Sequence, residues 1–388
     1  MRSTLQLFVF FILLQGVTDW YIYRRYISSW TRRWMHWVYW IPSYLLLIGM
    51  IWVFLTFEPQ PQAMNRFSLF LGIFLCISVP KALFSMVTVA LRAVTKKVNR
   101  KLYETYVGLV IALSSLSSLL FGITQGKELF QLKEVTIHSE KIPKGFNGYR
   151  IIQISDIHAG SWTGNPKGLQ KAVDMVNAQH PDLILFTGDM VNNLASELDE
   201  FISVLSQMKA KDGIYSILGN HDYSPYIKWE SKEAQQANLT SLIQKQEDMG
   251  WRMLNNSNAI VHHNGDSIAI LGVENSGKPP FPDYGDLPAA IKGTEGMYQI
   301  LMSHDPSHWR REILPKSDIA LTLAGHTHGM QLKILGFCPA RFAYPEYEGL
   351  YTEGEQKLYV NIGLGFLLYP MRLGAWPEIT LFTLSSDK

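Results

Sequence analysis

Long apolar runs separated by short polar connections fill the first third of the chain. Each run is close to the ~20 residues that a helix needs to cross the hydrocarbon core of a bilayer. The first run lacks a small-residue cleavage site, so a retained helix is favoured over a signal peptide. We therefore predict a four-helix transmembrane region within residues 1–125. The runs are Leu5–Ile22, Trp37–Phe57, Phe67–Leu91 and Tyr106–Ile123.

Basic residues are concentrated in two of the connections between these runs. Because cytoplasmic connections carry an excess of Lys and Arg, the first and third connections are predicted to face the cytoplasm. With four spans, the rest of the chain then lies on the extracytoplasmic side. The first connection carries Arg24, Arg25, Arg32 and Arg33, and the third carries Arg92, Lys96, Lys97, Arg100 and Lys101; the second has only Arg66 and the amino terminus only Arg2.

Lys81, next to Pro80, is a charged residue inside the third apolar run. A charge at such a position is a candidate functional group when it has an ionic partner. We expect no acidic partner within the spans and therefore expect Lys81 to snorkel from a shallow position. On the same expectation, a transport function for the helices has little support.

Residues 126–147 are predicted to be a linker that includes a strand leading into the soluble domain, and residues 148–388 alternate between strand and helix patterns. "YRIIQISDIH", "PDLILFTGD" and "DGIYSILGNHD" are apolar strands that end in polar residues. Helices are predicted over Lys167–Gln179, where Asn165 and Pro166 suit the cap and the first turn, and over Glu197–Lys209. This alternation indicates an α/β fold.

The polar residues that follow the strands are all types that bind metals. Asp156, Asp189 and Asn220 are 33 and 31 residues apart, the length of one strand-helix-strand unit. Parallel strands bring such residues to the same edge of a sheet. Two later strands, "MYQILMSHD" and "IALTLAGHTH", end in histidines, and imidazoles at i and i+2 on a strand point to one side. These histidines are His304, His326 and His328.

With His158, these side chains number seven, more than one tetrahedral zinc ion binds. A shared carboxylate can bridge two ions, as in two-metal phosphoryl transfer. Mixed oxygen and nitrogen ligands suit manganese, iron or zinc. The only cysteines, Cys76 and Cys338, exclude a cysteine-based zinc site, and the net charge of +2 argues against a charge-driven nucleic-acid partner.

The motifs "DIH", "GDM", "GNHD", "SHD" and "GHTH", in this order, resemble the calcineurin-like metallophosphoesterase superfamily. "GHTHGMQ", "NIGLGF" and "PEITLFTL" are similar to a bacterial membrane-attached branch. The resemblance implies a four-layer αββα sandwich over about residues 148–384. It also implies that Met330 departs from a position that is more often glycine. By motif, it implies a first metal on Asp156, His158 and His328, a second on Asn220, His304 and His326, a bridging Asp189, His221 as general acid, and Asp222 orienting His221.

The predicted function is a membrane-anchored hydrolase of a phosphate monoester or diester, with a small-molecule or lipid substrate. Alternatives are a UDP-2,3-diacylglucosamine pyrophosphatase of lipid A synthesis, whose substrate is made on the cytoplasmic side, and a non-catalytic membrane scaffold that retains the fold. The sequence leaves the oligomeric state open. Arg372 is a candidate phosphate clamp, because guanidinium binds phosphate bidentately. The loops at 274–288 and 336–354, rich in proline, glycine and aromatic residues, are candidates for shaping the pocket.

Overall fold

The computed structural model describes residues 2–56, 61–94 and 100–386. The predicted positions Phe57, Lys96 and Lys97 lie outside these residues. The chain forms two compact units: one contains residues 1–125 with 368–371, and the other contains 126–367 with 372–388. Each unit is described by itself.

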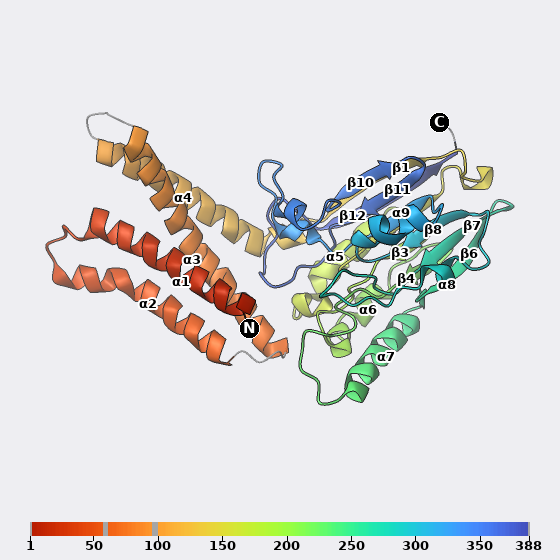
Figure 1. Ribbon diagram of the computed structural model, residues 1–388, viewed down its shortest axis with the longest axis horizontal. Helices are drawn as coiled ribbons and strands as arrows, with labels where there is room; N and C mark the ends of the chain where they lie inside the picture. The colour runs from red at the N-terminus through yellow and green to blue at the C-terminus, as the bar shows by residue number, and fades with distance from the viewer. Residues whose placement is uncertain (1, 57–60, 95–99, 387–388) are drawn as a thin grey trace. The chain divides into compact units, whose positions relative to one another are not determined.

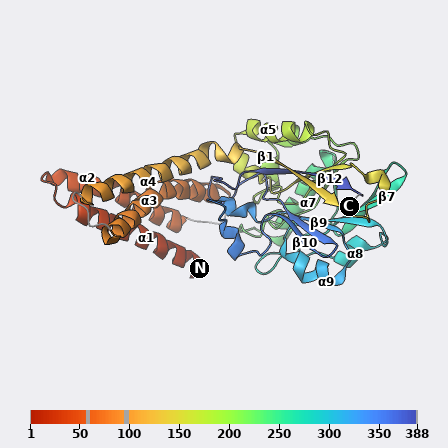
Figure 2. The same ribbon diagram turned by 90° about the horizontal axis from the view of Figure 1, so that it is seen from above.

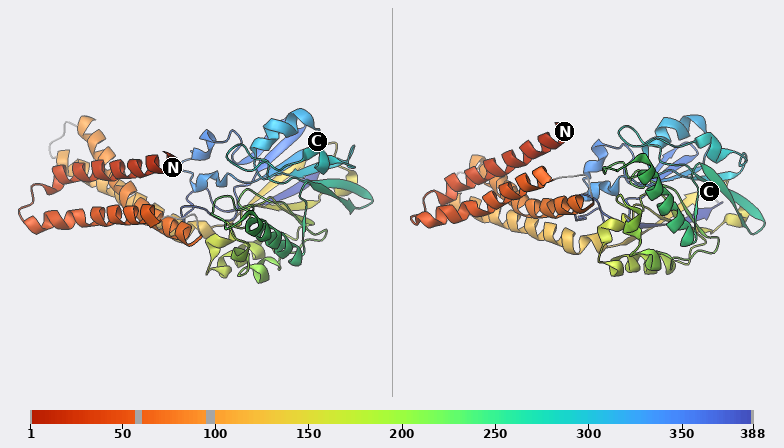
Figure 3. Two further views of the ribbon diagram at one scale, coloured as in Figure 1. Left: turned by 60° about the horizontal axis from the view of Figure 1, so that its bottom comes forward. Right: turned by 90° about the horizontal axis from the view of Figure 1, so that it is seen from below.

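The first unit is built from long helices, with α3 in contact with α1, α2 and α4 (Figure 3). Among the described residues, three helices are long and apolar enough to cross a membrane, over Arg33–Thr56, Ala63–Val94 and Arg100–Glu128. The first predicted run forms helix α1, and its crossing of the membrane stays a prediction. The helices are α1 (Arg2–Ile22), α2 (Arg33–Thr56), α3 (Pro61–Val94) and α4 (Arg100–Thr124).

The expectation for Lys81 is wrong, because an acidic partner lies within the first apolar run. Lys81 Nζ lies 2.9 Å from Asp19 Oδ1. The second Asp19 oxygen accepts hydrogen bonds from Gln15 Nε2 at 2.6 Å and from Ser43 Oγ at 2.5 Å. Three helices thus meet at one buried ionic group, and the expected lack of paired charges no longer argues against a transport function.

Substituting Lys81→Met is expected to destabilise the helical unit by about 3 kcal/mol, because it leaves the buried Asp19 carboxylate without its cation. The double variant Asp19→Asn/Lys81→Met is expected to recover most of this loss, since neither charge remains. Thermal unfolding of the full chain in detergent measures both effects. A double variant no more stable than the single one would contradict the pairing.

The second unit contains two mixed six-stranded sheets. The first sheet has the order β1-β12-β2-β3-β4-β5 and the second has the order β10-β11-β9-β8-β7-β6. Within them, β2 to β5 run parallel, as do β7, β8, β9 and β11. The strands are β1 (Gln131–His138), β2 (Arg150–Ile154), β3 (Leu183–Phe186), β4 (Ile214–Ser216), β5 (Trp251–Met253), β6 (Ser257–His263), β7 (Asp266–Gly272), β8 (Tyr298–Met302), β9 (Leu321–Ala324), β10 (Gly349–Glu353), β11 (Gln356–Val360) and β12 (Glu378–Ser385).

The buried residues of this unit form three layers that follow the alternation of side chains along the strands. Ile151 and Leu185 of the first sheet pack with Ile300 and Leu323 of the second in a central layer. The neighbouring positions face outward and are covered by helices, which Figures 1 and 2 show on the two outer sides of the sheets. The covering helices are α5 (Pro166–Asn177), α6 (Ile202–Leu205) and α7 (Lys232–Asp248) on the first sheet, and α8 (Leu287–Ile291) and α9 (Leu314–Lys316) on the second.

One of the two predicted helices of this unit is confirmed. Helix α5 has Asn165 as its N-cap, with the side chain accepting from Gly168 N, and Pro166 in its first turn. The predicted helix over Glu197–Lys209 is wrong. It is replaced by a 3₁₀ turn over Ala195–Leu198 and the single-turn α6, and the Glu197 carboxylate accepts hydrogen bonds from the preceding backbone amides of Asn192, Asn193 and Leu194.

The last strand of the chain lies inside the first sheet. β12 pairs in parallel with all eight residues of β1 and antiparallel with β2. The segment predicted as a linker therefore contributes an edge strand, and residues near the carboxyl terminus complete the sheet that positions the site.

Candidate metal centre

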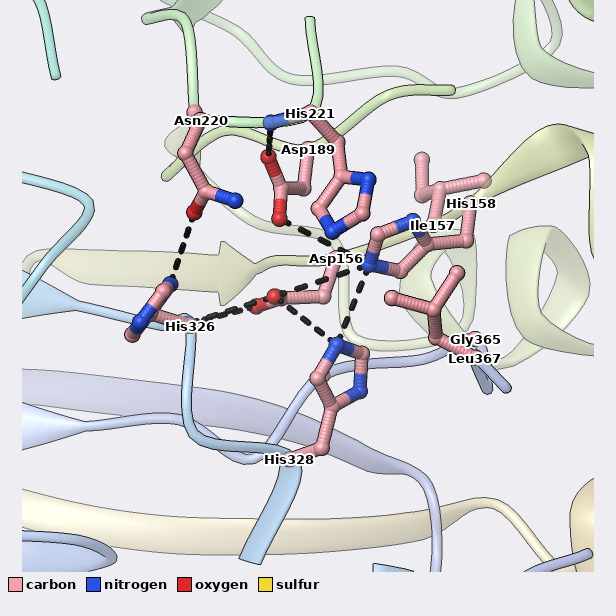
Figure 4. A network of polar contacts seen from close by, with 12 residues as sticks. Asp156, Ile157, His158, Asp189, Asn220, His221, His326, His328, Gly365 and Leu367 are labelled. Carbon is pink, nitrogen blue, oxygen red and sulfur yellow. Dashed lines mark hydrogen bonds and ion pairs between the residues drawn. The ribbon is translucent and has the colours of Figure 1, made fainter. Parts of the chain in front are cut away.

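The candidate ligands follow the carboxyl ends of strands in both sheets. β2, β3 and β4 of the first sheet lead into Asp156, Asp189 and Asn220, and β8 and β9 of the second lead into the histidines. The two sheets deliver their ligands to one place, where Figure 4 shows the carboxylates, the amide and the imidazoles of the labelled polar residues pointing toward one another. The predicted convergence of these residues is confirmed.

The first group consists of Asp156, His158 and His328, all buried. His328 Nε2 lies 3.0 Å from His158 Nε2 and 3.2 Å from Asp156 Oδ1. Two imidazole nitrogens and a carboxylate oxygen therefore face a common point. A divalent cation there would bind all three atoms.

The second group consists of Asp189, His304 and His326, joined by Asn220. His304 Nε2 lies 3.2 Å from Asp189 Oδ2, and Asn220 Oδ1 lies 3.1 Å from His304 Nε2 and 2.8 Å from His326 Nδ1. These atoms again surround one point and combine oxygen with nitrogen.

A single oxygen of Asp189 reaches both groups. Its Oδ2 lies 3.2 Å from His304 Nε2 in the second group and 3.6 Å from His158 Nε2 in the first. The carboxylate is 1% exposed. This is the position that a ligand shared by two cations would occupy.

The protonation of the site suits divalent cations. Burial lowers the pKa of His158 to about 3 and that of His326 to about 4, so both rings are neutral and offer lone pairs. Burial would lower the pKa of His304 as well, but the Asp189 charge raises it to about 10. Without a metal ion, the proton on His304 compensates the negative charge of Asp189, which a bound cation would otherwise compensate. The charges and donor atoms of these residues therefore fit divalent metal ions.

Left-handed backbone, rather than strand geometry, aims the paired histidines. β9 ends at Ala324, and His326 and His328 have φ of +73° and +51°. The two imidazoles join different groups, His328 the first and His326 the second, as the family resemblance implied. Gly325 allows the close approach, since a Cβ there would lie 2.4 Å from Asp156 Oδ2.

His221 lies beside the first group with one nitrogen fixed. Its Nδ1 lies 2.8 Å from the carbonyl oxygen of Asn192, to which it donates, and its backbone N donates to Asp189 Oδ1 at 2.8 Å. The ring packs edge-on against His158 at a centroid distance of 5.0 Å. This leaves Nε2 as the nitrogen that can exchange a proton with a substrate.

Asp222 does not orient His221, which corrects the expectation from the sequence. Its carboxylate accepts hydrogen bonds from the backbone N of Gly219 at 2.8 Å, of Asp189 at 3.0 Å and of Met190 at 2.8 Å. Asp222 therefore holds the loop that carries Asp189, and the Asn192 carbonyl orients the imidazole of His221.

Arg372 lies behind His328. The side chain is fully buried and donates to the carbonyl oxygens of Gly365 at 2.7 Å and Ile362 at 2.7 Å, and its Nη2 lies 3.1 Å from His328 Nδ1. A phosphate clamp requires an accessible guanidinium face. The geometry thus favours a positioning role over the predicted substrate contact.

Two aromatic side chains that sequence reasoning did not single out touch His326. Tyr344 OH lies 2.7 Å from His326 Nε2, and the Phe281 ring meets the His326 ring edge-on at 4.7 Å. Both belong to the loops proposed to shape the pocket, 336–354 and 274–288. The proline and aromatic content of those loops was the signal in the sequence that they line the site. Which of their side chains reaches the site depends on the loop conformation, which the sequence pattern does not give.

Comparison with known proteins identifies the family of the chain. Residues 1–127 match the model of the probable calcineurin-like phosphoesterase transmembrane domain, and residues 149–330 match that of the calcineurin-like phosphoesterase. An uncharacterized metallophosphoesterase of Bacillus subtilis, YkuE, is 31% identical over 66% of this chain and 86% of its own length. The chain belongs to the calcineurin-like metallophosphoesterase family.

Relatives of this metallophosphoesterase occur in bacteria and eukaryotes. The "Transmembrane protein with metallophosphoesterase domain" of Danio rerio is 33% identical over 67% of this chain, which spans 58% of that relative's length. The uncharacterized metallophosphoesterase Cj0846 of Campylobacter jejuni is 27% identical over 97% of both chains. This chain is therefore a membrane-associated member of the metallophosphoesterase family.

Proposed function

We propose that this chain hydrolyses a phosphate monoester or diester outside the cytoplasm, with two divalent ions in one site and four membrane spans. The two ions are manganese, iron or zinc, as the mixed ligands favour. The observation that carries the proposal is the position of Asp189 Oδ2, within 3.2 Å of His304 Nε2 and 3.6 Å of His158 Nε2. One carboxylate serving both groups is what a two-ion site requires.

Asp156, His158 and His328 would hold one ion and Asn220, His304 and His326 the other, with Asp189 shared. The ions would supply polarisation of the phosphoryl group and activation of the attacking water. His221 acts as general acid from its imidazolium form: because Nδ1 donates to the Asn192 carbonyl, Nε2 holds a proton for the leaving oxygen only when the ring is cationic. Burial lowers the pKa of His221 and the Asp189 carboxylate opposes that shift. Asp222 and Arg372 hold Asp189 and His328 in place.

The side of the membrane is inferred from the basic residues of the first and third connections. A reporter protein that works only in the cytoplasm can be fused to the carboxyl terminus of the chain. Activity of that reporter would contradict this topology. The extracytoplasmic placement argues against the UDP-2,3-diacylglucosamine pyrophosphatase alternative. The complete ligand set argues against a scaffold that has lost catalysis. The substrate is a phosphorylated small molecule or lipid.

Metal removal tests the proposal on the full chain in detergent. Thorough chelation is expected to abolish hydrolysis of aryl phosphate monoesters and diesters, and restored manganese, iron or zinc is expected to recover it with about two ions bound per chain. Metal analysis and turnover are measured on the same samples. Turnover that survives chelation, or full activity with a single ion, would refute the two-ion proposal.

A further inference from the structure

A tight hairpin with exposed apolar side chains follows the metal ligand His328. We call residues 330–342 the apolar hairpin. Ile334 and Phe337 exchange two backbone hydrogen bonds of 2.9 Å, and Leu335 and Gly336 between them have φ of +49° and +81°. Positive φ at both central residues is the type I′ geometry.

The residue at the tip of this hairpin is unfavourable in two ways. Leucine is poorly suited to left-handed backbone, where asparagine or glycine is preferred. Leu335 is also fully solvent-exposed, at 103% of the reference value, which is costly for an apolar side chain in water. The turn between β6 and β7 has the same positive φ values and carries Asn264 and Gly265. The hairpin between β6 and β7 thus carries the residues that this turn type prefers, whereas the apolar hairpin carries a leucine at the first of the two positions.

The exposed leucine is part of a larger apolar surface. Met330, Ile334, Phe337 and Phe342 are between 39% and 79% exposed. The rings of Phe337 and Phe342 pack against each other at a centroid distance of 5.8 Å, and exposed apolar side chains gathered on one short segment indicate a binding surface. The base of the hairpin is fixed, because Lys333 N donates to the Leu373 carbonyl at 2.8 Å and Cys338 Sγ contacts the Gly329 carbonyl at 3.1 Å.

Two cations lie beside this surface, one of them paired with a carboxylate. Residues 329–345 contain Lys333 and Arg341 and no carboxylate; Lys333 pairs with Glu348, and Arg341 is exposed. Apolar and aromatic side chains with flanking cations are typical of segments that lie in the membrane interface. Because the chain carries membrane-spanning helices, a bilayer is always present at high effective concentration.

We propose that the apolar hairpin inserts into the interfacial layer of the bilayer and that the metal centre acts on phosphate esters of amphiphiles held in that bilayer. This inference rests on the proposed phosphoesterase function. Both ends of the loop adjoin the site: His328 precedes the hairpin, and Tyr344, two residues beyond it, contacts His326 at 2.7 Å. A headgroup at the surface that the hairpin penetrates is therefore presented to the ligands.

Fluorescence quenching tests the insertion on the full chain in nanodiscs of phosphatidylcholine and phosphatidylglycerol. Leu335→Cys and the matched control Asn264→Cys are labelled with an environment-sensitive dye, and identically treated wild type corrects for the native cysteines. Doxyl-lipid is expected to quench the dye at 335 and not at 264, with the reverse for iodide. If iodide alone quenches the dye at position 335, the proposal is overturned. It is also overturned if neither reagent quenches that dye, because the position is then covered by protein.

Kinetics separate failure of this inference from failure of the proposed function. The variant Ile334→Thr/Leu335→Asn, whose two exposed side chains lie outside the loop 336–354, is expected to lose about tenfold in kcat/KM for a lipid phosphate ester in vesicles and to keep its rate on a soluble aryl phosphate. A wild type inactive on both substrates would reject the proposed function. Two results would reject only the role of the hairpin, provided that the wild type hydrolyses the soluble substrate. One is a variant with unchanged activity on the lipid ester, and the other is a wild type without activity on the lipid ester.

Discussion

Replacing Asp189 with alanine is expected to release both metal ions and to lower phosphoesterase turnover by at least ~10³-fold. Asp189 Oδ2 lies 3.2 Å from His304 Nε2 in the second group and 3.6 Å from His158 Nε2 in the first, so its loss is expected to weaken both sites at once. Electrostatic stabilisation of the transition state by each donor or cation is typically worth ~10²–10³-fold, and here two cations depend on one side chain. Metal content by elemental analysis and turnover on an aryl phosphate measure the effect.

Asp174→Asn, on the exposed face of α5, is the control for removing a carboxylate remote from the site. Asp189→Asn is the second test variant, because it retains an oxygen that can accept the His221 amide and separates loss of charge from loss of the loop structure. Thermal unfolding of the metal-free proteins checks that each folds. Two bound ions in Asp189→Ala would be inconsistent with a shared carboxylate.

His221→Ala is expected to show the opposite combination: normal metal content with turnover reduced ~10²–10⁴-fold. His221 contributes only its backbone N to Asp189, and alanine retains that N–H. The lost proton donor affects poor leaving groups most, so an alkyl ester should lose far more activity than a nitrophenyl ester. Parallel assays of the two esters, with metal analysis, measure this.

The exposed His262→Ala, on β6, is the matched control for loss of an imidazole and should leave both rates unchanged. Equal losses on the two esters would mean that His221 affects metal or substrate binding instead of the leaving group. Full activity of His221→Ala would eliminate the acid role.

The ligands could be predicted from the sequence because their signal is local. A buried apolar strand followed directly by Asp, Asn or His marks a strand end, and parallel order brings such ends together, as Asp156, Asp189 and Asn220 demonstrate. His304 and His326 follow strands of the second sheet, and their meeting with Asp189 and Asn220, which follow strands of the first sheet, depends on how the two sheets pack. That packing was implied by the family resemblance and not by the spacing of the residues.

The errors concern contacts that local patterns do not encode. The partner of His221 is a backbone carbonyl of Asn192, and any residue could supply such an atom, so Asp222 was assigned in its place. Arg372 lies 44 residues beyond the ligand that it contacts. Asp19 is present in the sequence of the first predicted run, whereas its pairing with Lys81, 62 residues away on another helix, depends on helix packing that hydropathy alone does not report.

The place of β12 has a consequence for biosynthesis. Residues 378–385 lie between β1 and β2, strands that leave the ribosome more than two hundred residues earlier. The first sheet therefore has a gap between β1 and β2 until residues 378–385 have been synthesised, and the domain cannot complete this sheet before then. A polypeptide that stops before residue 378 would keep every candidate metal ligand and still lack the strand that joins β1 to β2.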